Sequence, residues 1–341
     1  MEDPSNEVFS LQNDLPEEWT LIVLLIVGIY LIVMAFVITA MDESNNKTTL
    51  DNNMSTQKND TTSIPQLFGI STALFVLLIF VGAIVILAII FLAIRITEQK
   101  VLFVPHKTQM YRKIGGNWIQ LRSGGGLLHC TPHANPNSRP LLFLHGNTGN
   151  LDLYEAALKR CARLGYNMYA LEYAGYGLAA GNEKVIPNCD SVLQDVLESW
   201  NVCGSEHAII MGFSLGGAIL GKTYDRLNPM PAQIVFLNTF HSLSGLVESK
   251  LKVLGPLITP FLKTQWSTQP PRFYYNNVLI VYTKDDDVVT PEQGKELKTI
   301  FQSLNPVVVE LPDGGHRYST IRHLDRWANN ECLLPPFINS G

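Results

Sequence analysis

The sequence predicts an α/β fold in which a mostly parallel β-sheet is flanked by helices and preceded by a hairpin of two membrane-spanning helices. Three observations lead to this prediction. Two long uncharged runs lie near the N-terminus, strand-like and helix-like segments alternate after residue 98, and one strand leads through Gly-x-Ser-x-Gly into a helix. Alternating strands and helices are typical of a parallel sheet that is covered on both faces.

The hydrophobic composition favours membrane segments joined to a globular domain. The 341 residues are 46% hydrophobic and only 16% charged. Residues 1–20 form an acidic tail that lacks the basic start of a signal peptide. Residues 21–40 and 67–95 are each long enough to cross a hydrocarbon core of roughly 30 Å as a helix. The polar residues 41–66 between them are expected to form an exposed loop.

The loop 41–66 predicts the orientation of the chain in the membrane. It carries three N-glycosylation sequons, at Asn46, Asn53 and Asn59, whereas the much longer segment after residue 95 carries none. Lysine and arginine residues follow the second apolar run, and such residues near span ends favour the cytoplasm. We therefore expect a lumenal or extracellular loop, with the N-terminus and the globular domain in the cytosol. Chance sequons in a loop rich in Asn and Thr are the alternative.

Charge and cysteine content give no support to nucleic-acid binding or to a metal site. The first 94 residues hold ten acidic residues and two lysines, and the remainder holds twenty acidic and twenty-three basic residues. The globular part is therefore near neutral, which gives no support to nucleic-acid binding. The five cysteines lack the spacing of a metal site. We expect reduced, mostly buried thiols and neither a metal ion nor an organic cofactor.

The segment 98–341 is long enough for one domain. Its elements follow from apolar runs of alternating or helical spacing and from the glycines and prolines between them. The expected strands are a hairpin at 111–128 and segments 140–145, 166–172, 207–211, 233–238, 278–282 and 307–311, and the expected helices are 151–164, 189–200, 218–227, 291–301 and 319–328. An insertion at 241–265 carries leucines at helical spacing. We favour an amphipathic helix packed on the sheet, and the alternative is a lid whose apolar face meets acyl chains or the bilayer.

Ser214 stands at the centre of Gly-x-Ser-x-Gly, between an apolar strand and a helical segment. A sharp turn at this point lifts the serine hydroxyl clear of the sheet, and the glycines at 212 and 216 allow strand and helix to cross closely. The start of the following helix offers free N–H groups, including that of Leu215, to a developing oxyanion. The pentapeptide alone is a weak signal because glycine and serine are common.

Three further motifs follow predicted strands and strengthen this signal. The glycines of His145-Gly-Asn-Thr-Gly-Asn150 favour the Asn147 N–H, or less strongly that of Thr148, as a second oxyanion donor. Asp286, which two residues separate from the valine that returns to the sheet, is the expected acid, with Asp285 and Asp287 as solvated neighbours. His316 follows two glycines in a loop that can reach Ser214. Each motif alone is compatible with an ordinary turn, but together they predict a Ser214–His316–Asp286 triad.

Residues 98–341 resemble the α/β-hydrolase family, in particular the membrane-anchored branch that includes protein depalmitoylases and related lipid hydrolases. The matching stretches are His145-Gly-Asn-Thr-Gly-Asn150, Tyr173-Ala-Gly-Tyr-Gly177, Gly212-Phe-Ser-Leu-Gly-Gly217, Asn238-Thr-Phe-His-Ser242, the Asp286 turn and Gly315-His316. The chain departs from these relatives, which usually carry Arg where Ala174 stands, Ser near Leu178 and His-Gly in place of Tyr282-Thr283.

The resemblance implies a membrane-anchored serine hydrolase that cleaves an ester or thioester of an acyl lipid or an S-acylated protein. Ser214 would attack the carbonyl, His316 would transfer the proton, and Asp286 would orient the imidazole. The Asn147 and Leu215 amides would bind the oxyanion. Two alternatives remain open: an acyltransferase that uses the same triad, and a scaffold of the same fold with an idle site.

Overall fold

The protein is described here from a computed structural model. The structure describes residues 72–111, 114–131, 137–181, 186–271, 277–316 and 333–334. The chain divides into two units, residues 1–93 and residues 94–341. The predicted span 21–40, the loop 41–66 with its three sequons, and the predicted helix 319–328 lie outside the described residues.

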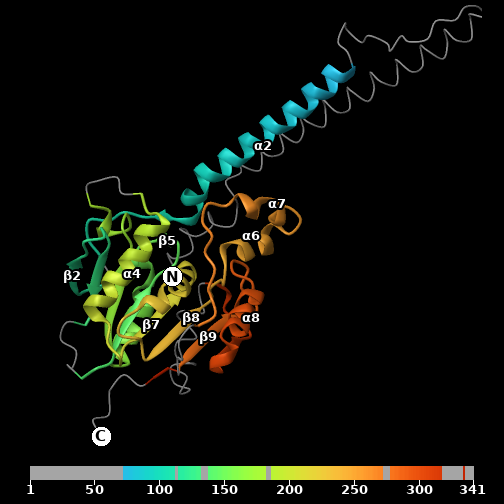
Figure 1. The fold of residues 1–341 in the computed structure, drawn as a ribbon. Coiled ribbons are helices and arrows are strands. Elements are labelled where there is room, and N and C mark those ends of the chain that lie inside the picture. Colours follow the sequence, from blue (N-terminus) through green and yellow to red (C-terminus); the bar gives the residue numbers. More distant parts are fainter. Residues whose placement is uncertain are drawn as a thin grey trace, which may run out of the picture. The chain divides into compact units, whose positions relative to one another are not determined.

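Helix α2 (Thr72–Leu102) contains most of the second predicted span (Figure 1). Its stretch from Ile79 to Leu102 is long and apolar enough to cross a membrane by length and composition, with a hydropathy of 3.0. The helix continues past Arg95, where we expected the span to end. Leu102 and the following Phe103 are buried in the core of the second unit. Packing of the helix end therefore extends the helix through residues that carry charge.

The second unit is built on a mostly parallel sheet, as the sequence predicts (Figure 1). Its strand order is β10-β9-β8-β7-β4-β6-β3-β2. The strands are β2 (Asn117–Gln120), β3 (Gly126–His129), β4 (Pro140–Leu144), β6 (Asn167–Glu172), β7 (Ile209–Phe213), β8 (Gln233–Leu237), β9 (Val278–Thr283) and β10 (Val307–Leu311). Among the described strands of this sheet, only the β2–β3 and β3–β6 pairs are antiparallel, which confirms the predicted hairpin at that edge. A separate short pair joins β1 (Val104–Pro105) to β5 (Thr148–Gly149).

The helices alternate with these strands along the chain. They are η1 (Leu151–Tyr154), α3 (Glu155–Arg163), η2 (Leu178–Ala180), α4 (Cys189–Cys203), α5 (Leu215–Thr223), η3 (Tyr224–Arg226), α6 (Leu243–Leu251), α7 (Gly255–Ile258), η4 (Thr259–Phe261), α8 (Pro291–Ile300) and η5 (Gln302–Leu304). Local sequence explains where α4 and α8 begin. The Asn188 side chain accepts the backbone N–H groups of Asp190 and Ser191 in a capping box, and Pro291 occupies the first turn of α8.

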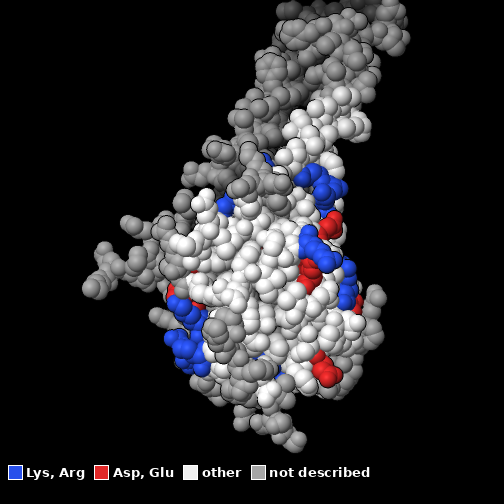
Figure 2. Space-filling model, turned by 90° about the vertical axis from the view of Figure 1, so that its left-hand side faces the viewer, with Lys and Arg blue, Asp and Glu red and all other residues white. Residues whose placement is uncertain are grey.

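The surface agrees with the near-neutral charge expected of the globular part. Figure 2 shows that charged side chains of the described residues gather in a few clusters on this face and leave uncharged surface between them. No broad field of one sign is visible among the described residues on this face.

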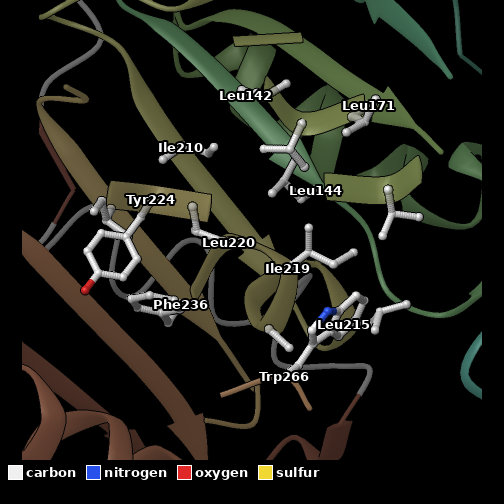
Figure 3. Packing of buried hydrophobic residues seen from close by; sticks show 14 of the residues in the cluster. Leu142, Leu144, Leu171, Ile210, Leu215, Ile219, Leu220, Tyr224, Phe236 and Trp266 are labelled. Atoms are coloured by element: carbon white, nitrogen blue, oxygen red, sulfur yellow. The ribbon is translucent and has the colours of Figure 1, made fainter. Parts of the chain in front are cut away.

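The hydrophobic core lies on both faces of the sheet. Successive residues of β4 alternate between the two clusters, since Leu142 and Leu144 belong to one, while Leu141 and Phe143 belong to the other. The first cluster packs under α4, α5 and α8, and Figure 3 shows Leu142, Leu144, Leu171, Ile210 and Phe236 of the strands with Leu215, Ile219 and Leu220 of α5. Burial of each such side chain stabilises the fold by about 1.5–3 kcal/mol. This packing holds the strands and helices that position Ser214, Asp286 and His316.

The cysteines of the described residues are free thiols. Cys161 and Cys203 are buried, and Cys130 and Cys189 are half-buried. Burial raises the pKa of the Cys161 and Cys130 thiols to about 12. A thiol held neutral in this way is a poor nucleophile. The fifth cysteine, Cys332, lies outside the described residues.

Candidate active site

Ser214 lies in a strained turn between β7 and α5. Its φ is 52° and its ψ is −120°, a conformation that side-chain-bearing residues rarely adopt. Hydrogen bonds hold the turn, because the Ser214 N–H donates to the Leu237 carbonyl at 3.0 Å and the Thr239 hydroxyl donates to the Ser214 carbonyl at 2.5 Å. The turn therefore matches the predicted elbow, with the serine at the carboxyl ends of the parallel strands.

The glycines on either side of Ser214 are required by close packing. A Cβ on Gly212 would lie 2.6 Å from the Gly216 carbonyl oxygen, and a Cβ on Gly216 would lie 2.6 Å from the His145 carbonyl oxygen. Real Cβ atoms do not approach backbone this closely. Larger residues would force α5 away from β7 and β4, and the serine would move with it.

The structure brings Ser214, His316 and Asp286 into one hydrogen-bonded chain. His316 Nε2 lies 2.9 Å from Ser214 Oγ, and His316 Nδ1 lies 2.8 Å from Asp286 Oδ2. All three residues are at least nine-tenths buried. The His316 ring also packs against Phe213, with ring centroids 4.9 Å apart. A serine hydroxyl on one imidazole nitrogen and a carboxylate on the other is the arrangement that nucleophilic serine chemistry uses.

Asp286, rather than Asp285 or Asp287, contacts the imidazole. Its Oδ1 accepts the backbone N–H groups of Val288 at 2.9 Å and Val289 at 2.7 Å, which leaves Oδ2 for His316. The carboxylate is thereby held in one orientation by three hydrogen bonds. The turn that returns the chain to the valines supplies two of these bonds, so the spacing of Asp286 to Val289 has a direct structural reason.

Asp285 is a solvent-exposed neighbour of Asp286, as expected, but it has a further role in the structure. Asp285 is exposed, but its carboxylate accepts the N–H groups of Gly314 at 3.1 Å and Gly315 at 2.9 Å. These two residues immediately precede His316. Asp285 therefore ties the loop that carries the histidine to the turn that carries Asp286, a role that the triplet of acids did not reveal.

Asn238 and Thr283, to which the sequence analysis assigned no role, hold the same loop. The Asn238 side-chain amide donates to the Gly315 carbonyl at 3.1 Å and to the Thr283 hydroxyl at 3.0 Å. The Thr283 hydroxyl in turn donates to the Gly315 carbonyl at 3.0 Å. Both residues stand at the carboxyl ends of β8 and β9, and polar residues directly after apolar strands were the signal that pointed to them.

The two expected oxyanion donors lie at the same edge of the sheet. Leu215 is the first residue of α5, and Asn147 follows β4. Within the described part of the chain, neither backbone N–H donates a hydrogen bond. The Asn147 carbonyl is held from behind by the Val104 N–H at 2.9 Å and the Tyr176 hydroxyl at 2.7 Å. The loop is thus held through the Asn147 carbonyl, while the Asn147 N–H stays available to a substrate oxygen.

A buried polar group supports this loop, and sequence reasoning missed it. His145 Nε2 and Glu172 Oε1 are 3.0 Å apart, both side chains are fully buried, and the contact is not aligned as a hydrogen bond. The other Glu172 oxygen accepts the Tyr111 hydroxyl and the Leu151 N–H, the latter at 3.1 Å. Burial, followed by the Glu172 carboxylate, raises the pKa of the Tyr111 hydroxyl well above its ordinary value. Glu172 ends β6, so its place at a strand end was the available signal.

The insertion at 241–265 forms two α-helices, α6 and α7, followed by the short η4. α6 begins at a Ser242 cap whose hydroxyl accepts the Gly245 N–H at 3.0 Å, and it ends before Lys252. α7 follows after a tight turn. Leu246 and Val247 of α6 pack on the core, which agrees with the favoured expectation for that part of the insertion.

Among the described residues, no group of three acidic, histidine or cysteine side chains is placed to hold a metal ion.

Comparison with known proteins gives concordant results. A family model described as serine aminopeptidase, S33, matches residues 135–288, a segment that includes Ser214 and Asp286. Protein bem46 of Schizosaccharomyces pombe is 26% identical over 170 residues, which cover 47% of this chain and 55% of that protein. The match therefore spans just over half the length of this curated relative.

A solved structure supports the fold. An esterase of Pyrococcus furiosus superposes with a TM-score of 0.52 at 13% identity, over 67% of this chain and 95% of that chain. At this identity the likeness concerns the fold alone. The sheet order and the strained serine between strand and helix are those of an α/β-hydrolase fold, and the matches in sequence support membership of the α/β-hydrolase family.

Proposed function

We propose that this protein is a membrane-anchored serine hydrolase that cleaves an ester or thioester of an acyl lipid or an S-acylated protein. The observation that carries the proposal is the hydrogen-bonded chain from Ser214 Oγ through His316 to the buried Asp286. It lies at the carboxyl ends of the parallel strands, where open α/β sheets bind their ligands. The strained Ser214 backbone argues against an idle scaffold, because strain of this kind persists where function needs it.

The reaction would proceed in two acyl-transfer steps. Ser214 Oγ attacks the carbonyl carbon while His316 Nε2 takes the hydroxyl proton, and the Asp286 carboxylate stabilises the resulting imidazolium through Nδ1–H. Collapse of the tetrahedral intermediate breaks the bond to the alcohol or thiol, which leaves with the proton from His316. Water then attacks the acyl-serine by the same route and releases the carboxylic acid.

The N–H groups of Asn147 and Leu215 are the proposed oxyanion donors. Each would donate to the carbonyl oxygen as it gains negative charge, and removal of one such donor typically costs about 10²–10³ in kcat. The Asn147 N–H shares its peptide plane with the Gly146 carbonyl, and the oxygen of that carbonyl lies 2.7 Å from His145 Nδ1, so the plane that carries this donor is held in advance. Preorganised donors of this kind need no rearrangement at the moment of reaction.

The membrane anchor suggests the class of substrate. Helix α2 has the length and composition of a membrane span, and residues 21–40 are proposed as the first span of a two-pass hairpin. A site tethered at a bilayer meets acylated molecules that partition there. We propose that the catalytic domain, 98–341, and the N-terminus face the cytosol, and that the loop 41–66 is lumenal or extracellular and glycosylated at Asn46, Asn53 and Asn59.

Acyl-substrate profiling in membranes tests this function directly. The full chain and Ser214→Ala are incubated with a panel of acyl lipids, acyl thioesters and short soluble esters, and released acids are quantified. Ser205→Ala is the matched control, because Ser205 lies outside the site and its hydroxyl only accepts the His207 N–H. Turnover that depends on Ser214 supports the proposal, and equal turnover by Ser214→Ala contradicts it. A glycerol or alcohol acceptor in parallel reactions separates hydrolysis from acyl transfer.

A further inference from the structure

An exposed apolar surface stands at the far end of the 241–265 insertion. We define the apolar tip by the side chains of Val253, Leu254, Leu257 and Phe261, which are 83%, 49%, 65% and 37% exposed. Single exposed apolar residues are normal on protein surfaces, but a contiguous group usually marks an interaction site. The proposed catalytic residues Ser214, His316 and Asp286 come from other segments of the chain, so the chemistry of the site does not account for this group.

The apolar tip belongs to a tightly closed helical turn. Lys252 takes a left-handed conformation, with φ of 37°, and reverses the chain after α6. Gly255 then packs on α6 so closely that a Cβ would lie 2.6 Å from the Glu248 Cα. The Thr259 hydroxyl donates to the Glu248 carboxylate at 3.1 Å and closes the turn. The apolar side chains are therefore held on the outside of a built structure.

The chain that leaves the apolar tip is bound to the end of α2. Glu98 is buried, and its carboxylate accepts the backbone N–H groups of Lys263 at 2.5 Å and Thr264 at 2.6 Å. Phe103 makes an edge-on contact with Trp266, with ring centroids 6.2 Å apart. These contacts all lie within the second unit. They hold the residues next to the tip against the turns where the apolar stretch of α2 ends.

Proximity to the end of α2 suggests what the tip contacts. Consecutive Cα atoms are about 3.8 Å apart, so Phe261 lies within about 8 Å of Lys263, which Glu98 binds. Arg95, Glu98 and Lys100 are the first charged residues after the apolar run of α2, so this level of the helix corresponds to a bilayer surface. The tip is thus tied to the place where the span would leave the bilayer.

Charge around the tip suits the same partner. Lys252 and Lys263 flank the apolar side chains and are exposed. The acidic residue of α6, Glu248, is engaged by Thr259. Apolar side chains bordered by lysines are typical of surfaces that enter the boundary between lipid headgroups and acyl chains, where the ammonium groups meet phosphate.

We propose that the apolar tip inserts into the interface of the bilayer that α2 crosses, as a second membrane contact of the catalytic domain. The proposal rests on the membrane anchoring proposed above and adds to it a specific surface. Entry of the apolar tip into the lipid interface would hold the catalytic domain in one orientation on the membrane. The site would then face molecules presented at the lipid surface.

Fluorescence quenching by brominated lipid tests the proposal. The full chain carrying Leu257→Trp is reconstituted in phosphatidylcholine nanodiscs with or without lipid brominated near the headgroup end of its acyl chains, and wild-type emission is subtracted. The tip should reach about 5–10 Å into the interface, so the added emission should be blue-shifted and quenched at least about twofold. Val307→Trp is the matched control, because Val307 is an exposed valine on β10, and its emission should be unchanged.

Each other outcome overturns the proposal. Absence of quenching at position 257, or equal quenching at 257 and 307, excludes specific insertion. A blue shift without lipid quenching would assign the tip to another protein surface, such as a second copy of this chain. Val253→Trp provides an independent probe if Leu257→Trp fails to fold, which fluorophosphonate labelling of the nanodisc sample reports.

Alkaline extraction of the same membranes separates this proposal from the proposed function. A chain released into the soluble fraction would contradict membrane anchoring itself. A chain that stays in the membrane and shows no quenching at 257 or 253 would overturn only the contact made by the apolar tip.

Discussion

His316 Nε2 lies 2.9 Å from Ser214 Oγ, although 102 residues separate the two in the chain. Ser214 occupies the turn after β7, and His316 follows β10 at the edge of the same sheet. Parallel strands place their carboxyl ends at one edge, so loops from distant parts of the chain meet there. The Asn238 amide and the Thr283 hydroxyl donate hydrogen bonds to the Gly315 carbonyl, and these bonds hold the loop that carries His316.

Removal of either residue should abolish activity without unfolding the domain. We expect Ser214→Ala and His316→Ala each to lower kcat by about 10⁴- to 10⁶-fold, as loss of a nucleophile or its base does in serine hydrolases. Fluorophosphonate labelling in gel and thermal unfolding of the same samples check this. Wild-type labelling of Ser214→Ala would identify another nucleophile.

Asp286→Asn should lower kcat by about 10⁴-fold while Tm changes little. The amide oxygen can still accept the N–H groups of Val288 and Val289, so the turn is retained, but the amide group favours the wrong tautomer of His316. Steady-state kinetics on a short ester measure the effect. Asp287→Asn is the matched control, and a loss of similar size there would contradict the assignment to Asp286.

Asp285→Asn should have an intermediate effect. Its carboxylate accepts two N–H groups, from Gly314 and Gly315, and an amide replaces one acceptor oxygen with a donor. Loss of one such bond costs about 1–2 kcal/mol, so kcat should fall roughly tenfold through displacement of His316. Asp285→Glu, which keeps the charge, should recover part of the rate. A variant with unchanged kcat would show that the loop is held without Asp285.

The buried Asp195 should make stability depend on pH. Burial raises its pKa from 3.8 to about 6, although the backbone N–H groups of Ala174 and Gly125 donate to its carboxylate and lower it in part. A carboxyl whose pKa is raised by folding favours the folded state most below about pH 4, and this contribution is lost as pH rises to about 6. The loss amounts to roughly 2–3 kcal/mol, at about 1.4 kcal/mol per pKa unit.

Comparison with Asp195→Asn isolates this group from the other carboxylates. The free energy of unfolding of the wild type minus that of the variant should decrease between pH 4 and pH 6.5. Denaturant titrations of the detergent-solubilised chain at several pH values measure the difference. A difference that stays constant over this interval would mean that Asp195 titrates alike in the folded and unfolded states.

Glycosylation and protease access test the predicted orientation. In a eukaryotic host, glycosidase treatment should shift the mobility of the wild type but not that of a triple Asn46/Asn53/Asn59→Gln variant. Protease added to intact microsomes should digest the catalytic domain. A protected domain together with an unglycosylated loop would falsify the orientation.

The order of strands and helices was predictable because it depends on local patterns. Apolar runs of strand length such as 278–282, and the helical spacing after Ser214, are readable from neighbouring residues alone. The same holds for Ser214, Asp286 and His316 as candidates, since each lies in the turn or loop after a predicted strand and the chain order of the three is that of the family. Boundaries were less certain, because the extension of α2 to Leu102 depends on packing against residues distant in the chain.

The contacts that hold the site could not be read from the sequence. The hydrogen bonds of Asp285 with Gly314 and Gly315 join residues about 30 positions apart in the chain. The hydrogen bond between Glu98 and Lys263 joins residues 165 positions apart. The sequence does not tell whether a carboxylate in a turn or at a helix end is bound by water alone or by distant backbone N–H groups. Periodicity reports only which face of an element is apolar. Which polar groups meet across the sheet edge is decided by the three-dimensional path of the loops, and therefore by the tertiary structure alone.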